Sequence, residues 1–308
     1  MKATAPANLL MSSPPAWAGG WGEDEAGRFA QLCLPKLAIE LAPIVPGEFW
    51  MGSPENENGR LPWERRHRVR LTRGYWLGRY PVTQQEYEAV MGKNPSQFKG
   101  GDRPVDSVTW NEAEAFCQRL TELAREAEVM RAGMVFRLPT EAEWEYACRA
   151  GTESAFNDGS DCSEPVGQEP ALDRLGWYGE NSGNKTHPVG EKEPNGWGLY
   201  DLHGNLWEWC ADRAEWKDGV VTDTYVDGAV DPMNWKGARR VVRGGGCWYV
   251  ARYCRSAFRF AVEPGYRIGD QGFRLAAGQE LGSGASGPEA GGAAAPEPED
   301  RDAQPGPA

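Results

Sequence analysis

The sequence predicts an α+β fold with few regular elements and much loop, and three observations support this class. Short stretches alternate apolar and polar residues, as strands do when one face is buried. Three threonine-led capping signals mark the starts of helices. A polar segment rich in Gly, Asn and Asp spans 151–194, which is too long for an ordinary connection. The 308 residues, 40% of them hydrophobic, suffice for one large domain or two small ones.

The first third of the chain carries the clearest strand signals. We expect one or two short strands within 28–45 and an apolar strand at 49–51 that runs into a Gly-Ser-Pro turn. Around residue 70, Val69 and Leu71 alternate with arginines. This alternation predicts a strand with one buried side and one side that faces solvent.

Three helices are predicted to begin after Thr83, Thr109 and Thr140, because each threonine has a glutamate three residues later. In such a capping box the hydroxyl accepts a free backbone N–H and the glutamate reaches back to the cap. Apolar residues at helical spacing form one face of the second helix, namely Ala113, Phe116, Cys117, Leu120, Leu123 and Ala124. The third helix can turn both Trp144 and Cys148 toward the core.

We expect a single folded domain over residues 25–276. A partly ordered leader (1–24) precedes it, and a tail (277–308) follows. The tail has no aromatic residue and too few apolar residues to offset the entropy of ordering, so we expect disorder there.

Composition excludes several classes of function. The net charge of −12 argues against broad nucleic-acid binding, which relies on clustered Lys and Arg. No run of about 18 apolar residues predicts a membrane span, and the N-terminus is a poor signal peptide. The seven cysteines show no zinc-like spacing and fit reduced thiols, so a cytoplasmic location is expected. No organic cofactor is expected.

The segment 239–276 is the most unusual part of the chain. It opens with a short apolar strand and a glycine triplet, and arginines then alternate with large aromatic and aliphatic residues without a clear period. Aromatic side chains with two torsions make good contact residues at low entropic cost, but they also fill cores. The arginines suit either an anionic ligand or loop carbonyls and acids such as Asp201 or Glu208. The residues alone leave these alternatives open.

Five segments resemble the formylglycine-generating enzyme and sulfatase-modifying factor family, in the order found there. They are GEFWMGSP (47–54), RPVDSVTWNEAEAFCQRL (103–120), FRLPTEAEWEYACRAGT (136–152), NGWGLYDLHGNLWEWCAD (195–212) and RVVRGGG…CRSAFR…GFRLA (240–276). The resemblance covers roughly residues 25–276. It implies a variant of the C-type lectin fold.

The family's enzymes bind Cu(I) through two cysteines five positions apart, and soft thiolates suit that ion. The resemblance places the second cysteine on Cys254 and the first on Tyr249, which cannot serve. Cys247 lies two residues earlier, on the same face of an extended strand, and is the remaining partner. The resemblance aligns Cys117 and Cys148 with one cysteine of each of the family's two disulfides. Arg259 and Leu275 occupy the positions of the partner cysteines, so both disulfides are expected to be absent.

The end of the chain also resembles the variable region of proteins diversified by retroelements, in which template adenines are miscopied and asparagine codons change. The resemblance implies ligand contacts at Trp248, Tyr249, Val250, Arg252, Tyr253, Phe258, Phe260, Ala261, Val262, Tyr266, Ile268, Gly269 and Asp270. It implies a fixed frame at Arg243, Gly244, Gly245, Cys254, Arg255, Ser256, Arg259, Pro264, Arg267, Gly272, Phe273 and Arg274.

The family resemblance further implies a structural Ca²⁺ site in the turn LYDLHGNLWEW. Its ligands would be the carboxylates of Asp201 and Glu208 and the backbone carbonyls of Gly204 and Leu206. Such oxygen ligands are what Ca²⁺ prefers. The alternative is that the two carboxylates only cap the turn.

Three functional hypotheses follow from the sequence. The first is a non-enzymatic binding protein whose hypervariable surface recognises a macromolecular ligand, with a protein as the expected partner. The second is a copper-dependent formylglycine-generating or related sulfur-oxidising enzyme, with Cys254 and Cys247 as its reactive residues. The third is a sensor or effector domain that does not vary.

Overall fold

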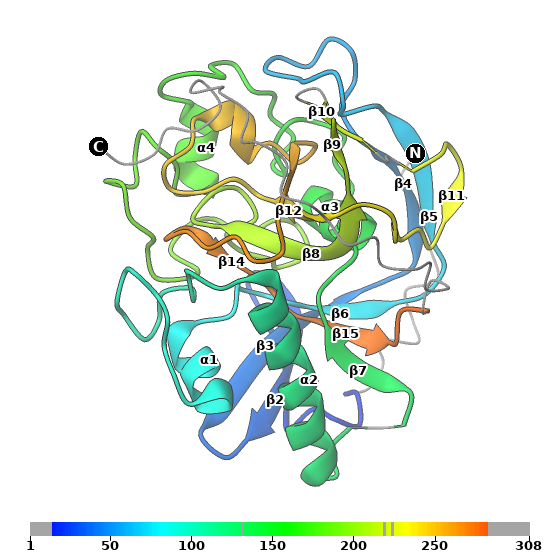
Figure 1. Ribbon diagram of the computed structural model, residues 1–308, viewed down its shortest axis with the longest axis vertical. Helices are drawn as coiled ribbons and strands as arrows, with labels where there is room; N and C mark the ends of the chain where they lie inside the picture. The colour runs from blue at the N-terminus through cyan, green and yellow to red at the C-terminus, as the bar shows by residue number, and fades with distance from the viewer. Residues whose placement is uncertain (1–13, 131, 218–219, 223–224, 283–308) are drawn as a thin grey trace.

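The computed structural model describes residues 14–130, 132–217, 220–222 and 225–282, which form several small sheets joined by long loops (Figure 1). The largest sheet is antiparallel throughout. Its strands lie in the order β1 (Gly20–Asp24), β2 (Gly27–Leu34), β3 (Leu37–Ile44), β6 (Tyr75–Gly78), β15 (Ala276–Gln279) and β7 (Met134–Arg137). The strands expected within 28–45 are therefore confirmed.

Three smaller sheets complete the strand arrangement. A four-stranded sheet has the order β13 (Arg259–Val262), β12 (Arg239–Arg243), β8 (Trp207–Ala214) and β14 (Gln271–Gly272). A three-stranded sheet contains β11 (Ala229–Val230), β5 (His67–Leu71) and β4 (Gly47–Met51), and a two-stranded sheet contains β10 (Val220–Val221) and β9 (Trp216–Lys217). In β5 the buried and exposed residues alternate as predicted.

The helices are α1 (Gln84–Met91), α2 (Trp110–Glu126), α3 (Glu141–Arg149) and α4 (Pro170–Leu175), with one 3₁₀ turn, η1 (Ala251–Cys254). The first three begin at the predicted threonines, and each forms the full capping box. The sequence analysis missed α4, which lies inside the segment predicted as loop. It has only six residues, with Glu169 as its cap and a proline in its first turn.

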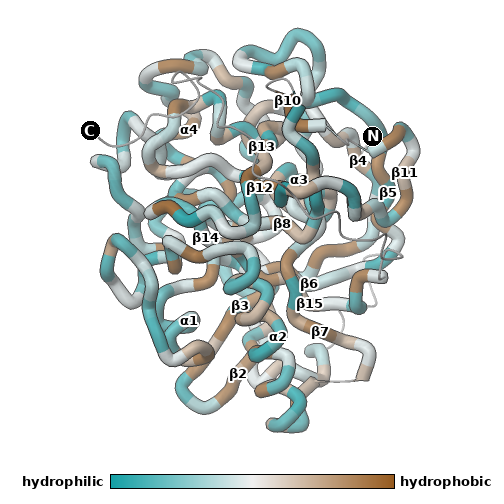
Figure 2. Tube along the Cα trace, viewed as in Figure 1, coloured by the Kyte–Doolittle hydropathy of each residue, from teal (hydrophilic) through white to brown (hydrophobic). Residues whose placement is uncertain are grey.

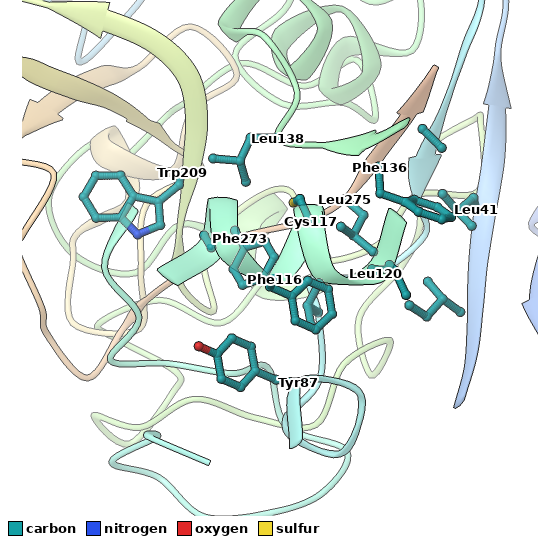
Figure 3. Close-up of a cluster of buried hydrophobic side chains, with 14 of the residues drawn as sticks. Leu41, Tyr87, Phe116, Cys117, Leu120, Phe136, Leu138, Trp209, Phe273 and Leu275 are labelled. Carbon is teal, nitrogen blue, oxygen red and sulfur yellow. The ribbon is translucent and has the colours of Figure 1, made fainter. Parts of the chain in front are cut away.

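One face of α2 packs into the main core (Figure 3). The rings of Tyr87 and Phe116 stack at 5.4 Å, and Phe273 meets Phe116 edge-on at 5.3 Å. The predicted α2 face is buried apart from Leu123, which is half-buried. Figure 2 shows hydrophobic stretches on strands such as β2 and β7, and mostly hydrophilic connecting loops.

Helix α3 is buried along its whole length, although it contains three glutamates and an arginine. Trp144 and Cys148 both face the core, as predicted. Burial of the charged residues requires partners, because an unpaired charge in a protein interior is strongly unfavourable. Glu143 pairs with Arg137, and Glu145 pairs with Arg149 in the same helix. Arginines from the end of the chain supply the other partners.

The ordered part of the chain extends beyond the predicted limits of the domain. Strand β1 and the buried Trp17 fall within the predicted leader, and β15 continues to Gln279, past the predicted boundary at 276. The predictions for residues 1–13 and 283–308 lie outside the described residues. No helix in the described ranges is long and apolar enough to cross a membrane.

Candidate ligand-binding surface

Glycines shape the passage from β12 into residues 248–270, which we call the contact segment. Gly244 and Gly245 have φ angles of +95° and +73°, a region that favours glycine. A Cβ atom on Gly245 would lie 2.6 Å from the Sγ of Cys254 in η1. The glycines therefore let the chain turn sharply while η1 packs directly against it.

Two buried arginines attach this region to helix α3. Arg243 donates to Glu145 and also to three carbonyl oxygens of residues 256–258, at 2.7–3.0 Å. Arg259 makes two hydrogen bonds to the carboxylate of Glu141, at 2.6 and 2.7 Å. Paired Arg–carboxylate contacts of this kind fix orientation as well as distance.

Two further buried arginines bind acids elsewhere in the chain. Arg255 donates to both oxygens of Glu64, at 2.6 and 2.9 Å, and to Glu57. Arg274 holds both oxygens of Glu208, at 2.6 and 2.7 Å. These four arginines therefore satisfy carbonyls and acids inside the protein, and none of them is available to an anionic ligand.

Aromatic rings form a chain of contacts over this frame, in which the buried Trp207 joins two half-exposed groups. Tyr253 meets Tyr249 edge-on at 5.7 Å, and Tyr249 contacts the buried Trp207 at 5.1 Å. On its other side Trp207 meets Phe260 at 6.3 Å. Phe260 contacts Trp216 at 4.9 Å, and Trp216 contacts Trp63 at 6.3 Å. We call the half-exposed members the aromatic surface, namely Tyr249, Tyr253, Phe260, Trp216 and Trp63.

The aromatic surface includes residues that the sequence analysis missed. Trp63 and Trp216 lie far from the contact segment in the sequence, as does Phe98, whose ring meets Trp248 at 5.9 Å. The unusual number of tryptophans, 14 in all, was the available signal. It did not say which of them would meet the contact segment.

The structure divides the thirteen predicted contact residues into two groups. Eight are half-exposed, namely Trp248, Tyr249, Val250, Arg252, Tyr253, Phe260, Tyr266 and Ile268. The other five are buried, which does not fit direct contact with a ligand: Phe258, Ala261, Val262, Gly269 and Asp270.

The position of β13 explains three of the buried residues, because packed side chains cover both of its faces. Ala261 joins the cluster that contains Trp144, whereas Phe258 and Val262 join the cluster that contains Trp209. These side chains support the surface from below. The other two, Gly269 and Asp270, lie under the ring and the backbone around Trp248.

Asp270 is a buried acid whose carboxylate oxygens have no well-formed hydrogen bond among the described residues, although the backbone N–H of Trp248 lies near them. Burial, and next the charge of Asp106, raise the pKa of Asp270 well above its usual range. The Cys247 thiol and the Tyr249 and Tyr266 hydroxyls also lie near this acid. The ionised carboxylate of Asp270 is therefore energetically unfavourable in its place beneath the aromatic surface.

The cysteines assigned to a copper site are both completely buried. Burial raises the pKa of the thiols of Cys247 and Cys254, and the thiolate is the form that binds metals. Tyr249, which the resemblance places at the position of the first cysteine, lies half-exposed in the aromatic surface. All seven cysteines are free thiols, including Cys117 and Cys148.

The predicted calcium ligands already have partners within the protein. The carboxylate of Glu208 accepts from Arg274 and also from the Nε1 of Trp144 at 2.7 Å. Asp201 accepts from the backbone N–H of Gly190 at 2.8 Å, and burial raises the pKa of Asp201 to about 6. N–H donors thus surround both carboxylates, and this donor set does not fit a bound cation.

We therefore expect calorimetric titration of chelator-treated protein with Ca²⁺ to give no saturable heat. Binding would require the Arg274 guanidinium to leave Glu208, which would cost a buried charge pair. The matched variant is Asp201→Asn, and the melting temperatures of this variant and of the wild type should both be unaffected by Ca²⁺. A stoichiometric heat that Asp201→Asn abolishes would restore the calcium site.

The fold and the order of its motifs define a class of protein. Residues 36–278 match the model of the sulfatase-modifying factor enzyme 1-like domain, and the chain belongs to that family. The formylglycine-generating enzyme of Mus musculus is 32% identical over 220 residues, which cover 68% of this chain and 53% of that protein. The chain spans 50% to 61% of the length of three curated relatives that it matches.

Solved structures place the chain more narrowly. Treponema denticola variable protein 1 is 31% identical and superposes with a TM-score of 0.66, covering 80% of this chain and 98% of that one. PvdO from Pseudomonas aeruginosa is 26% identical with a TM-score of 0.61, covering 86% and 99%. The predicted family and fold class are confirmed by these matches.

Proposed function

We propose that this protein binds a macromolecular ligand, a second protein, through a surface that a retroelement diversifies. The observation that carries the proposal is the separation between frame and contacts. Ten of the twelve predicted frame residues are buried; Pro264 is half-buried and Arg267 exposed. Eight predicted variable residues lie half-exposed above them. Side chains at the surface can therefore change without disturbing the buried charge pairs.

The likeness to Treponema denticola variable protein 1 supports the same proposal. The chemistry of the surface suits a protein ligand, because Tyr and Trp supply large contact areas at low entropic cost and dominate binding energies. The cytoplasm is the proposed location, since buried free thiols suit a reducing compartment.

Sequencing tests diversification directly. We would deep-sequence the codons for residues 240–276 and the flanking few kilobases in a population of the source cells. The proposal expects a nearby imperfect repeat that differs mainly at template adenines, with changes concentrated at the half-exposed positions. An invariant sequence without a repeat would instead favour the sensor or effector hypothesis.

Binding can be tested before the natural ligand is known. We would select binders from a phage-displayed library of random peptides on the purified protein. Tyr253→Ala is expected to weaken the selected peptides about thirtyfold, the effect of losing a central aromatic contact. The control is Trp50→Ala, which removes an exposed aromatic residue on β4 and should leave affinity unchanged. Equal effects of the two variants would argue against the aromatic surface as the binding site.

The enzymatic alternative has one observation in its favour, the identity to formylglycine-generating enzymes. It requires a copper site from Cys254 and Cys247, whose buried thiols resist ionisation. We expect a Cu(I) titration to show no tight stoichiometric binding that depends on Cys254. Tight binding that disappears in Cys254→Ser would favour the enzyme and count against the binding proposal.

A further inference from the structure

Two arginines outside the frame lie opposite each other on adjacent strands of the four-stranded sheet. Arg213 of β8 and Arg240 of β12 are directly opposite in the antiparallel pairing, and both are half-buried. Like charges at such positions destabilise a sheet. No carboxylate in the described ranges lies within ion-pair distance of either guanidinium. This differs from the five frame arginines, each of which has an acidic partner.

The surroundings hold Arg240 in place without neutralising it. Its guanidinium lies 3.5 Å from the ring centre of Trp110, and its Nη1 donates to the carbonyl of Ala211 at 2.8 Å. Burial, with the charge of Arg213 adding to it, lowers the pKa of Arg240 to about 10. The stacked ring fixes the plane of the guanidinium and leaves donor positions unused.

Two acids influence this pair, and neither neutralises it. Asp212 is fully buried and accepts from the hydroxyl of Tyr225 and from the backbone N–H groups of Asn234 and Glu141. Glu114 of α2 attracts Arg240 but forms no ion pair with it, and burial raises the pKa of Glu114. Neither acid therefore occupies the hydrogen-bonding positions of the Arg213 and Arg240 guanidinium groups.

The arginine pair borders the contact segment. Arg240 is opposite Val262 in the pairing of β12 with β13, and the backbone N–H of Trp110 donates to the carbonyl of Pro264 at 3.0 Å. Arg239 lies over the ring of Trp216, a member of the aromatic surface, at 5.7 Å. Figure 1 shows the start of α2 just below β8, where the Nε1 of Trp110 donates to the carbonyl of Cys210.

We infer that Arg213 and Arg240 form a carboxylate-binding site, which receives an Asp or Glu side chain of a protein ligand docked on the aromatic surface. This inference rests on the proposed function. Two adjacent guanidinium groups can bind one carboxylate with paired charge-assisted hydrogen bonds, and the bound anion removes the repulsion between them. Every ligand must thus present an acidic side chain to this site, whatever contacts it makes with the variable residues.

The carboxylate site can be tested alone with glutarate as the probe. We would follow the Nε–Hε signals of the arginines by NMR in labelled protein. The signals of Arg213 and Arg240 are expected to shift in a saturable way. Arg213→Gln should weaken this response about tenfold, the scale of one lost charge-assisted contact. Arg119→Gln, which removes the same charge from the exposed side of α2, should respond like the wild type. A response that is absent, or that is equal in both variants, overturns the site.

Peptide selection connects the site to the proposed function. Peptides selected on the wild type are expected to be enriched in Asp and Glu, and selection on Arg240→Gln should lose that enrichment while Tyr253 still matters. Tyr253-dependent peptides without acidic residues would overturn the inference and leave the proposed function intact. Glutarate binding without any Tyr253-dependent peptide would leave the carboxylate site standing and overturn the proposed function.

Discussion

Replacing Arg255 with Met is expected to lower the free energy of unfolding by about 3–5 kcal/mol, the range found when one partner of a buried ion pair is removed. Arg255 is fully buried and neutralises two carboxylates, Glu57 and Glu64, which the substitution would leave inside without a cation. Urea denaturation at pH 7, followed by tryptophan fluorescence, measures the loss.

Arg267→Met is the matched control in the same part of the chain. Arg267 pairs with Glu112 near the surface, where its side chain is 44% exposed. Exposed ion pairs contribute only about 0–1 kcal/mol. Arg255→Lys keeps the charge but loses the paired geometry, and its loss should fall between those of the two Met variants. If Arg255→Met lowers the free energy of unfolding no more than Arg267→Met does, the buried pairs of Arg255 do not stabilise the fold around the contact segment.

The second large effect is a gain in stability from Asp270→Asn, on the order of 2 kcal/mol near pH 8, which is the scale of an unsatisfied buried polar group. The amide has nearly the same size as the acid and carries no charge. In the wild type the carboxylate has no well-formed hydrogen bond among the described residues and faces the negative charge of Asp106. The change should appear as a higher melting temperature of the variant.

The pH dependence identifies the cause of this gain. Because the pKa of Asp270 is raised in the folded protein, its contribution to stability is fully present below the unfolded pKa, near 3.8. It is lost as the pH rises toward the folded value. The advantage of Asp270→Asn should therefore grow from about pH 4 upward and disappear at lower pH.

Asp106→Asn provides the opposite case. Asp106 accepts hydrogen bonds from the backbone N–H groups of Gln97 and Phe98, at 2.6 and 3.2 Å, and from the hydroxyl of Ser107 at 2.9 Å. The amide NH₂ of an asparagine would face some of these N–H and O–H groups and could not accept from them. We therefore expect this variant to be less stable than the wild type. If Asp270→Asn is also less stable than the wild type, the surroundings of Asp270 stabilise the carboxylate, and the expected gain is wrong.

Local signals predicted the helices well, because a capping box depends only on residues three positions apart. Thr83, Thr109 and Thr140 each begin a helix, as the sequence indicated. The alternating strand around residue 70 was equally local. The small helix α4 escaped because six residues beginning with a proline do not produce a helical pattern.

The frame could not be predicted in the same way, because its partners lie far apart in the sequence. Arg255 and Glu57 are separated by 198 residues, and Arg259 and Glu141 by 118. The sequence left open whether the arginines bind an anionic ligand or acids and carbonyls of the protein, and it did not show which acids these would be. For the same reason, it did not show that β13 would be covered on both faces, which buries Ala261 and Val262.

The position of β12 and β15 has a consequence for synthesis of the chain. β12 lies between β13 and β8, and β15 lies between β6 and β7, so the last part of the chain supplies interior strands to two sheets. A ribosome must therefore release nearly the whole chain before either sheet can close. A premature stop or a frameshift within the codons for residues 248–270 would remove β15 and leave β6 and β7 without the strand between them. Such truncated products would fail to fold, whereas proteins with single substitutions at exposed positions would still fold.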